Sequence, residues 1–242
     1  MAALKGRVAL VTGGSRGIGR AIAVSLADAG AAVAVNYLEK ATVAKQVADT
    51  IRDRGGKAMA VGADVSQGPA VKDMVEAVER ELGPIDVLVN NAGLGLVRTL
   101  DDLTEEDFDR TIAVNLKSVF LCTQAVIPGM RARKWGRIVN ISSGAARGAG
   151  GVGPHYNASK AGMEGMTRGY AARLVKDGIT VNAVAPSLIQ TDMVGAVASS
   201  ASRIPLGRFG TPEECGQVVM MLVGNEYMTG QTVALSGGLS FL

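Results

Sequence analysis

Short apolar runs rich in β-branched residues alternate with longer helical patterns along the whole chain of 242 residues. The runs are continuously apolar, as in Val8–Val11, which is typical of strands covered on both faces. Between them, apolar residues recur at steps of three and four, as in Val71–Leu82. This alternation predicts a parallel sheet with right-handed crossovers. The predicted strands are Val8–Thr12, Ala32–Asn36, Lys57–Val61, Val87–Asn90, Arg137–Ser142, Thr180–Ala185 and Thr232–Leu235.

The repeated strand–helix unit fills the chain and leaves no linker and no shift in composition. We therefore predict one α/β domain over residues 1–242, doubly wound, with a seven-stranded parallel sheet and helices on both faces. In an open sheet of this kind, ligands bind beyond the carboxyl ends of the strands. Functional residues are therefore expected directly after each strand.

Composition excludes several other classes of protein. The 25 basic and 22 acidic residues give a net charge of only +3 and are scattered, so no surface for nucleic acid is expected. Cys122 and Cys215 stand far apart and His155 is the only histidine, which argues against a disulfide framework and a metal site. No secretory leader is apparent, and no apolar run approaches the length of a membrane span. A cytoplasmic protein without a membrane partner is expected.

The first predicted strand runs into the glycine-rich turn Gly13-Gly-Ser-Arg-Gly-Ile-Gly19 and then into a helical pattern. A strand, such a turn and a helix N-terminus together predict a site for phosphate. The same residues also match the GxSxG turn of hydrolases, with Ser15 as nucleophile. That alternative needs a histidine late in the chain, for which only His155 is available.

The end of the second predicted strand indicates which dinucleotide binds. A dinucleotide-binding fold usually has Asp or Glu here to hold the ribose 2′-hydroxyl, whereas this chain has Asn36. Asn36 carries no charge to repel a 2′-phosphate, and Arg16 in the glycine-rich turn could pair with one. These residues favour NADP(H) over NAD(H). The alternative is that Arg16 is solvated and Asn36 is only a turn residue.

Tyr156 and Lys160 stand four residues apart in a predicted helix, so they share one face. An ammonium close to a phenol favours the phenolate and lowers its pKa by about one unit or more. The pair predicts acid–base chemistry at a carbonyl oxygen without a histidine. The strand ending near Ile141 brings Ser142 and Ser143 to the same edge, where a hydroxyl can hydrogen-bond that oxygen.

An ordered set of motifs covers essentially the whole chain. They are Thr12-Gly-Gly-Ser-Arg-Gly-Ile-Gly19, Asp64-Val65, Asn90-Asn-Ala-Gly93, Val114-Asn115-Leu116, Ser142-Ser143, Tyr156-xxx-Lys160 and Asn182-Ala-Val-Ala-Pro186. With these motifs the sequence resembles the short-chain dehydrogenase/reductase family, and within it the 3-oxoacyl-[acyl-carrier-protein] reductase branch. The resemblance implies a Rossmann-type fold with a dinucleotide-binding half up to about residue 135 and a catalytic and substrate half beyond it.

The resemblance also implies the roles of single residues. Tyr156 would be the catalytic acid/base, with Lys160 as its pKa partner and ribose ligand. Ser143, in preference to Ser142, would orient the substrate carbonyl, and Asn115 would hold a water that relays protons. The residues implied to bind the cofactor are Gly13, Ser15, Arg16, Gly17, Ile18, Gly19, Asn36, Asp64, Val65, Asn91, Gly93, Tyr156, Lys160, Ile189 and Thr191.

Structural alternatives remain open for three of these residues. Asn91 could be a turn residue, Asn115 a residue at a helix bend, and Asp64 the N-cap of the following helix. His155 is expected to line the pocket or face solvent.

The implied activity is reduction of a ketone, a 3-oxoacyl thioester or a related carbonyl, by NADPH to a secondary alcohol. The alternative is oxidation of a secondary alcohol with NAD. No metal is required. The family further implies a homotetramer, with the long helices after the fourth and fifth strands and the C-terminal segment Gly237–Leu242 at subunit contacts.

Two segments depart from the family pattern. Ser187 follows Pro186 where the family usually has glycine, so the turn beside the nicotinamide is expected to differ slightly. Val194–Ile204 is shorter than the usual substrate lid and largely uncharged, which suggests an open pocket.

A basic cluster precedes the fifth predicted strand. It could bind the phosphates of an acyl carrier or coenzyme A, although a solvated turn is the favoured interpretation. Asp177, where carrier-protein reductases tend to have a basic residue, weakens the carrier-protein interpretation further. The cluster consists of Arg131, Arg133, Lys134 and Arg137.

Overall fold

The computed structural model describes residues 4–191 and 201–240. It contains every strand predicted from the sequence, with ends that differ by two residues or fewer. The strands are β1 (Val8–Val11), β2 (Ala32–Tyr37), β3 (Ala58–Gly62), β4 (Ile85–Asn90), β5 (Gly136–Ile141), β6 (Ile179–Pro186) and β7 (Thr232–Leu235). The α-helices are α1 (Gly17–Asp28), α2 (Ala41–Asp53), α3 (Gly68–Leu82), α4 (Glu105–Ile112), α5 (Ser118–Arg133), α6 (Pro154–Leu174) and α8 (Pro212–Gly224).

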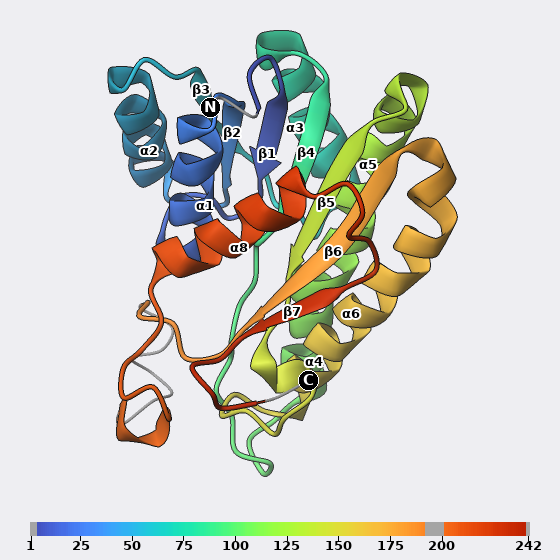
Figure 1. Ribbon diagram of the computed structural model, residues 1–242. Helices are drawn as coiled ribbons and strands as arrows, with labels where there is room; N and C mark the ends of the chain where they lie inside the picture. The colour runs from blue at the N-terminus through green and yellow to red at the C-terminus, as the bar shows by residue number, and fades with distance from the viewer. Residues whose placement is uncertain (1–3, 192–200, 241–242) are drawn as a thin grey trace.

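The strands form one parallel sheet in the order β3-β2-β1-β4-β5-β6-β7, which confirms the predicted α/β class (Figure 1). The chain reverses its direction of winding between β1 and β4. At such a point the carboxyl ends of neighbouring strands open a crevice for a ligand. The glycine-rich turn after β1 therefore lies at this crevice.

Helices cover both faces of the sheet, but one crossover has the opposite hand from that predicted. α1, α2 and α8 pack on one face, and α3, α5 and α6 pack on the other (Figure 1). Because β7 continues the series β4-β5-β6 while α8 lies on the face opposite α6, the β6–α8–β7 crossover is left-handed. The prediction of right-handed crossovers throughout is therefore wrong for this unit.

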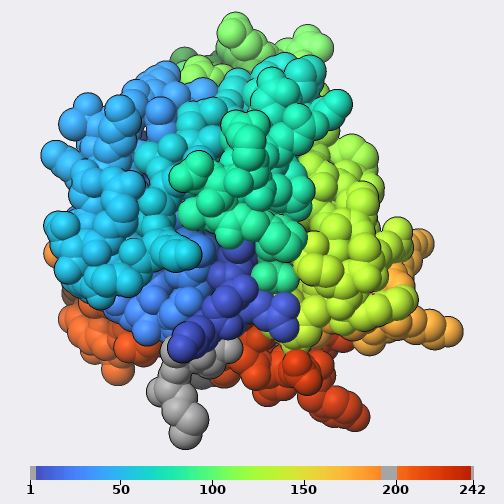
Figure 2. Space-filling view, turned by 90° about the horizontal axis from the view of Figure 1, so that it is seen from above, coloured from blue at the N-terminus to red at the C-terminus, as the bar shows by residue number. Residues whose placement is uncertain are grey.

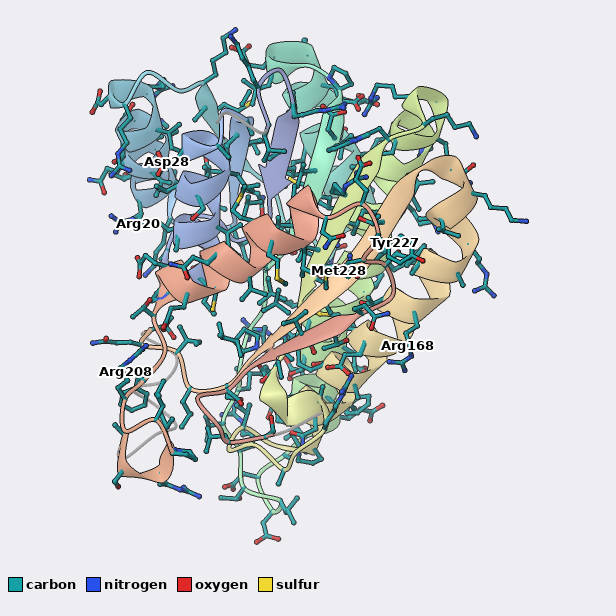
Figure 3. All side chains as sticks on the ribbon, viewed as in Figure 1. Arg20, Asp28, Arg168, Arg208, Tyr227 and Met228 are labelled. Carbon is teal, nitrogen blue, oxygen red and sulfur yellow. The ribbon has the colours of Figure 1, made fainter. Side chains whose placement is uncertain are left out.

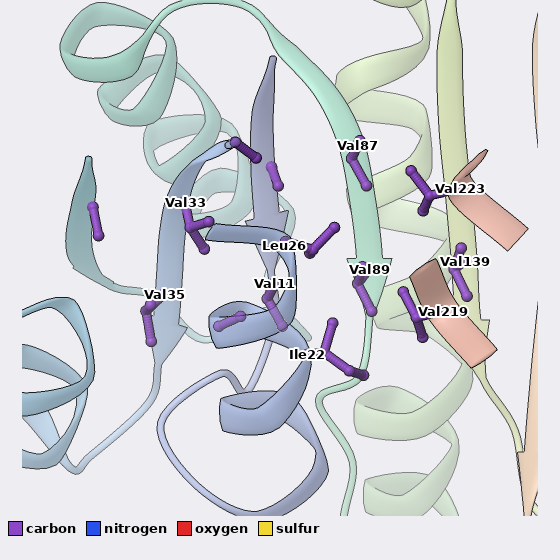
Figure 4. Close-up of a cluster of buried hydrophobic side chains, with 14 of the residues drawn as sticks. Val11, Ile22, Leu26, Val33, Val35, Val87, Val89, Val139, Val219 and Val223 are labelled. Carbon is purple, nitrogen blue, oxygen red and sulfur yellow. The ribbon is translucent and has the colours of Figure 1, made fainter. Parts of the chain in front are cut away.

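The packing of α8 explains this exception. α1 and α2 cover the β1–β3 side of their face and leave the β4–β5 side open. Val219 and Val223 of α8 fill that space against Val87, Val89 and Val139 (Figure 4). Burial of this apolar surface, at about 25 cal/mol per Å², offsets the usual preference for the right-handed connection.

The expectation that no apolar run approaches the length of a membrane span does not hold for the helical stretch Glu105–Arg133. This stretch joins α4 to α5 through a π-helical turn, Ala113–Lys117, and its 29 residues would suffice by length and composition to cross a membrane. That measure is weak evidence, because a helix packed on a globular core meets it too. Here Cys122, Val126 and Met130 are buried against the sheet. Only 39% of the most apolar window is buried, so much of it faces outward.

The basic cluster before β5 lies at the amino edge of the sheet, opposite the glycine-rich turn. Figure 2 shows this edge face-on, with the start of the chain in blue beside the segment before β5 in yellow-green. Arg131 and Lys134 both contact Asp177, at 2.7 and 3.2 Å, and Arg133 contacts Asp86 at 3.3 Å. These cations therefore pair with carboxylates of the same chain. These pairs support the favoured interpretation of the segment as a solvated turn, and contact with the phosphates of an acyl carrier or coenzyme A stays a prediction.

The single tryptophan lies in the same region. Two guanidinium groups lie against its ring, that of Arg7 at 3.8 Å and that of Arg137 at 4.3 Å from the ring centre of Trp135. Arg137 is only 2% exposed and pairs with Glu226 at 2.8 Å. The fourth member of the basic cluster is thus part of the protein interior.

Candidate active site

The glycine-rich turn after β1 depends on glycine at three places. Gly13 and Gly17 have φ of +59° and +52°, a region that side chains disfavour. A Cβ on Gly19, in the first turn of α1, would overlap the carbonyl oxygen of Gly13. Glycine therefore lets α1 begin directly against the end of β1.

The N-terminus of α1 is suited to an anion. Its N-cap residue, Arg16, has extended backbone and makes no side-chain capping hydrogen bond, and the first turn contains no acidic residue. N–H groups at such an end and the helix dipole attract negative charge. The geometry of the turn is therefore compatible with the predicted phosphate site, which stays a prediction. Contacts of Ser15, Arg16 and Ile18 with that group stay predictions.

The amide of Asn91, at the end of β4, fastens the glycine-rich turn. Its Nδ2 donates to the carbonyl oxygens of Thr12 and Gly13, both at 3.0 Å. Thr12 Oγ1 in turn accepts from the backbone N–H groups of Asn91 and Ala92, both at 3.0 Å. The structural interpretation of Asn91 thus has direct support. The role of Thr12 was missed, although the residue stands at the strand end within the first motif.

Asn36 has a different environment from the one predicted. Its side chain is buried, 2% exposed, and its Oδ1 accepts from the backbone N–H of Gly13 at 3.1 Å. Its Nδ2 donates to the carbonyl oxygens of Val61 and Ala63, at 3.3 and 3.2 Å. The amide therefore braces the glycine-rich turn against β3, which corrects the prediction that this side chain faces the ribose.

The Asp64-Val65 motif forms a turn before α3. Asp64 Oδ1 accepts from the backbone N–H and the hydroxyl of Ser66, at 2.9 and 2.7 Å. The N-cap of α3 is Gln67, so the N-cap interpretation of Asp64 is wrong. Val65 is buried. Contact of this turn with adenine stays a prediction.

The segment after β6 returns toward the glycine-rich turn. The methyl group of Thr191 lies close to Gly17, since a Cβ added to Gly17 would be 3.3 Å from it. Ile189 is 3% exposed and pairs its backbone with Gly210. Ser187 lacks the positive φ that would have required glycine and donates its N–H to Leu235 at 2.9 Å. Residues 194–200 of the predicted lid Val194–Ile204 lie outside the described residues, as do residues 241–242 of the C-terminal segment.

Ser143, Tyr156 and Lys160 meet at the same edge. Tyr156 and Lys160 lie in the first turns of α6, which confirms the predicted helix. The hydroxyl of Ser143, just after β5, lies beside the phenol of Tyr156 and interacts with it. Lys160 Nζ lies 5.7 Å from the ring centre of Tyr156 and donates to the carbonyl oxygen of Ile141 at 2.8 Å.

Burial has the largest effect on the pKa values of Tyr156 and Lys160. It raises the pKa of Tyr156 above the ordinary value, and the interaction with Ser143 opposes the shift. Burial also lowers the pKa of Lys160 to about 8. The predicted lowering of the pKa of Tyr156 by Lys160 is therefore not found, because both groups are desolvated and the ammonium is bound to Ile141. At neutral pH Tyr156 keeps its proton.

Asn115 lies in the π-helical turn and is fully buried. Its Oδ1 accepts from the backbone N–H of Leu94 at 2.8 Å, and its Nδ2 donates to Ser159 Oγ at 3.2 Å. A Cβ on Gly93 would come within 3.2 Å of Asn115 Oδ1 and 3.7 Å of Lys160 Nζ. The irregular turn supports the helix-bend interpretation, and its position beside Lys160 is compatible with the implied relay.

Ser159 is a connecting residue that the sequence analysis missed. It is fully buried, and its hydroxyl donates to the carbonyl oxygen of Tyr156 at 2.7 Å while accepting from Asn115. The residue stands inside the Tyr156-to-Lys160 motif, so its place in the chain was evident, but the inward orientation of its side chain could not be predicted.

His155 neither faces solvent nor lines an open pocket, which corrects that expectation. It is fully buried, and its Nε2 donates to the carbonyl oxygen of Leu96 at 3.0 Å. This bond ties the segment after β4 to the start of α6. The only histidine is thereby bound to backbone, which weakens the hydrolase alternative through Ser15.

Two open hollows lie in the described part of the chain, and neither is lined by Ser143, Tyr156 or Lys160. One, of about 440 Å³, lies between Arg98, Val152 and Asn157. The other, of about 470 Å³, lies near Gln190 and Arg208, whose guanidinium is bound to Glu214 (Figure 3). Tyr156 packs between Val152 and Ala145. The first hollow and the packing of Tyr156 therefore share Val152.

The family model described as short chain dehydrogenase matches residues 7–202. The chain belongs to this family. The match includes the glycine-rich turn and the Ser143, Tyr156 and Lys160 set, so the resemblance drawn from the motifs is confirmed.

Known members of the short-chain dehydrogenase family are similar over the full chain. A 3-oxoacyl-[acyl-carrier-protein] reductase FabG of Staphylococcus epidermidis is 42% identical, covering 96% of this chain and 98% of the relative. A 3-oxoacyl-[acyl-carrier-protein] reductase of Synechocystis sp. is 42% identical over 99% of both chains. The (2S)-[(R)-hydroxy(phenyl)methyl]succinyl-CoA dehydrogenase subunit BbsD of Thauera aromatica is 41% identical over 98% of both.

A solved structure has the same architecture. The blue fluorescent protein from a metagenomic library, in complex with NADPH, matches with a TM-score of 0.92 and 38% identity, covering 99% of this chain and 100% of the other. This match confirms the predicted fold class over the length of the chain.

Proposed function

We propose that this chain reduces the ketone of a 3-oxoacyl thioester or a related carbonyl compound with NADPH, and that Tyr156 is the general acid. Family membership and the 3-oxoacyl reductase relatives make it an NAD(P)-dependent oxidoreductase acting on CH–OH groups. The NADPH complex of the solved relative supports NADP(H) as the cofactor. The observation that carries the proposal is the placing of Ser143, Tyr156 and Lys160 together at one edge of the sheet, with Lys160 Nζ 5.7 Å from the ring centre of Tyr156.

The chain's own residues supply position and a proton. When bound, the reduced nicotinamide supplies the hydride. Ser143 Oγ accepts from the backbone N–H of Ala145 at 3.2 Å, which orients the hydroxyl so that its proton can be donated to the substrate oxygen. Tyr156, kept protonated by burial, gives its proton to the same oxygen as negative charge develops there. Lys160, with Asn115 beside it, returns a proton to the phenol.

Oxidation of a secondary alcohol with NAD is the alternative, because the same residues serve both directions. The similarity to a relative named as a dehydrogenase favours it. Oxidation needs the phenolate of Tyr156 as base, however, and burial disfavours that form at neutral pH. We therefore favour reduction.

A homotetramer in the cytoplasm is part of the proposal. Phe108 of α4 and Phe120 of α5 are 43% and 45% exposed, and Tyr227 before β7 is fully exposed (Figure 3). Large exposed apolar side chains on these elements support subunit contacts there. Both cysteines, Cys122 and Cys215, are unpaired and buried, which agrees with a reducing compartment.

The test is the loss of NADPH absorbance with a panel of ketones that includes acetoacetyl-CoA, repeated with NADH. We expect Tyr156→Phe to lower kcat by about 10²- to 10⁴-fold, the usual contribution of a general acid, while NADPH still binds. Tyr170→Phe is the matched control, because Tyr170 lies farther along α6 and contacts Gln124. Parental turnover by Tyr156→Phe would overturn the mechanism, and preference for NADH would overturn the cofactor assignment.

A further inference from the structure

A buried carboxylate beside the catalytic set takes no part in the reaction described above. Glu164 lies on α6, four residues after Lys160, and is only 4% exposed. Its Oε1 accepts from Ser142 Oγ at 3.2 Å, and its Oε2 pairs with Arg147 Nε at 2.8 Å. Burial of a charge is costly unless it is paired and hydrogen-bonded. The two oxygens of Glu164 have two different partners, and these partners show what the carboxylate does.

The partners of Glu164 lie at the two ends of one short segment. Ser142 directly follows β5, and Arg147 follows a 3₁₀-helical turn, Gly144–Ala146. The segment is also closed internally, because the Ser143 carbonyl accepts from the N–H of Ala146 at 2.9 Å. Ser143, whose hydroxyl contacts Tyr156, lies between the two attachment points. Glu164 thus fastens the loop of Ser143 to α6 at both ends.

The same helix carries the group with which Ser143 must act. Tyr156, Lys160 and Glu164 follow one another at steps of four residues, so they lie along one side of α6. A loop fastened to this side keeps the Ser143 hydroxyl in a fixed relation to the Tyr156 phenol. Misplacement of a catalytic group by about 1 Å can cost about 10²-fold in rate. A residue that sets the position of Ser143 without contacting the substrate can therefore control the rate of turnover.

We propose that Glu164, together with Arg147, is a positioning residue that holds Ser143 against Tyr156 for proton donation to the substrate oxygen. The proposal rests on the proposed function, since it assigns to Glu164 an effect on the ketone reduction carried out by that site. Glu164 itself contacts neither substrate nor the reacting atoms.

Single variants test the effect on turnover. Glu164→Gln keeps the shape and an acceptor for Ser142 but loses the ion pair, and Arg147→Met removes the other partner. For both we expect kcat to fall about tenfold, with KM and the affinity for NADPH changed by less than about twofold. Arg147→Lys, which retains the charge, should recover most of the lost rate. Arg54→Met is the control, because it breaks the Arg54–Asp28 pair (3.6 Å) at the opposite edge of the sheet.

A double-mutant cycle with Ser143→Ala separates positioning from general support of the fold. If Glu164 acts through Ser143, then Glu164→Gln should cost less than about twofold in kcat once Ser143 is alanine. An equal tenfold loss in both backgrounds would overturn the proposal, as would unchanged kcat in the single variant. A fall in the midpoint of urea unfolding that accounts for the lost activity would overturn it too.

Failure of this proposal can be told apart from failure of the proposed function. If the parent reduces ketones and Tyr156→Phe and Ser143→Ala are impaired, but Glu164→Gln is not, only the role of Glu164 is overturned. If the parent turns over no ketone, the proposed function fails and the role of Glu164 fails with it.

Discussion

Lys160 is a lysine with almost no access to water. It is 4% exposed, and its ammonium donates to the carbonyl oxygen of Ile141 at 2.8 Å. Removal of the ammonium from water lowers its pKa to about 8, while burial raises the pKa of Tyr156. The two shifts make the ammonium of Lys160 the stronger acid of the pair, whereas the ordinary pKa values of 10.5 for lysine and 10.0 for tyrosine are nearly equal. Transfer of a proton from the ammonium to the phenolate is then energetically downhill, which suits a residue that restores a proton to a phenol.

The buried lysine predicts a specific dependence of stability on pH. The pKa of Lys160 is about 8 in the folded state and 10.5 ordinarily, so between these values the unfolded chain binds more protons. The free energy of unfolding should therefore gain up to about 1.4 kcal/mol per pH unit from this group as pH rises through that range. Below about pH 8 both states hold the proton, and the contribution is constant.

Lys160→Met should lack this gain. Urea unfolding at about pH 7 and about pH 9.5 gives the free energy of unfolding of parent and variant. The difference between the two proteins at each pH removes the contributions of the other titrating groups, because both proteins share them. An identical pH dependence in the two proteins would contradict the burial of a charged ammonium at this position.

At the scale of elements, the site is built where strands end and a helix begins. The glycine-rich turn is held between β2, β4 and α1 by the side chains of Asn36 and Asn91. Neither amide needs to touch a ligand to be essential, because each satisfies backbone groups that the tight turn leaves without partners. The shape of the turn thus depends on side chains outside it.

Asn36→Asp tests this role directly. The carboxylate would still accept from Gly13 but would face the carbonyl oxygens of Val61 and Ala63, which lose their donor. We expect the free energy of unfolding to fall by about 2–3 kcal/mol and the affinity for NADPH and NADH to fall together. Asn225→Asp is the control, since Asn225 only accepts from the N–H of Tyr227 on the surface. Unchanged stability with a switch to NADH would instead mean that this side chain contacts the ribose.

The sequence allowed prediction of features set by local pattern. Continuous apolar runs placed all the strands, and a spacing of four residues placed Tyr156 and Lys160 on one face of α6. It did not allow prediction of features set by distant packing. The face chosen by α8, the inward direction of Asn36 and the pKa shift of Tyr156 depend on neighbours far away in the sequence.

At the scale of the whole molecule, the exposed apolar surface is uneven. The stretch Glu105–Arg133 is apolar enough to resemble a membrane span, yet most of its apolar window is not buried within one chain. Phe108 and Phe120 lie on this stretch. Contact with a second copy would remove such side chains from water, at about 25 cal/mol per Å² of apolar area.

Phe120→Asp should therefore weaken the assembly. A carboxylate at a buried contact is costly, so we expect a smaller species by light scattering and sedimentation, while the circular dichroism of the fold is retained. Leu38→Asp, at an exposed position directly after β2, is the control and should leave the assembly size unchanged. An unaltered assembly in Phe120→Asp would place the subunit contacts elsewhere.

The indole of Trp135 gives the molecule a natural optical probe. It is the only tryptophan, and the guanidinium groups of Arg7 and Arg137 pack against it at the end of the sheet remote from the glycine-rich turn. Unfolding removes the guanidinium groups from the indole and exposes it to water, so its fluorescence emission should move to longer wavelength. Intrinsic fluorescence can thus follow unfolding in the variants above without an added dye.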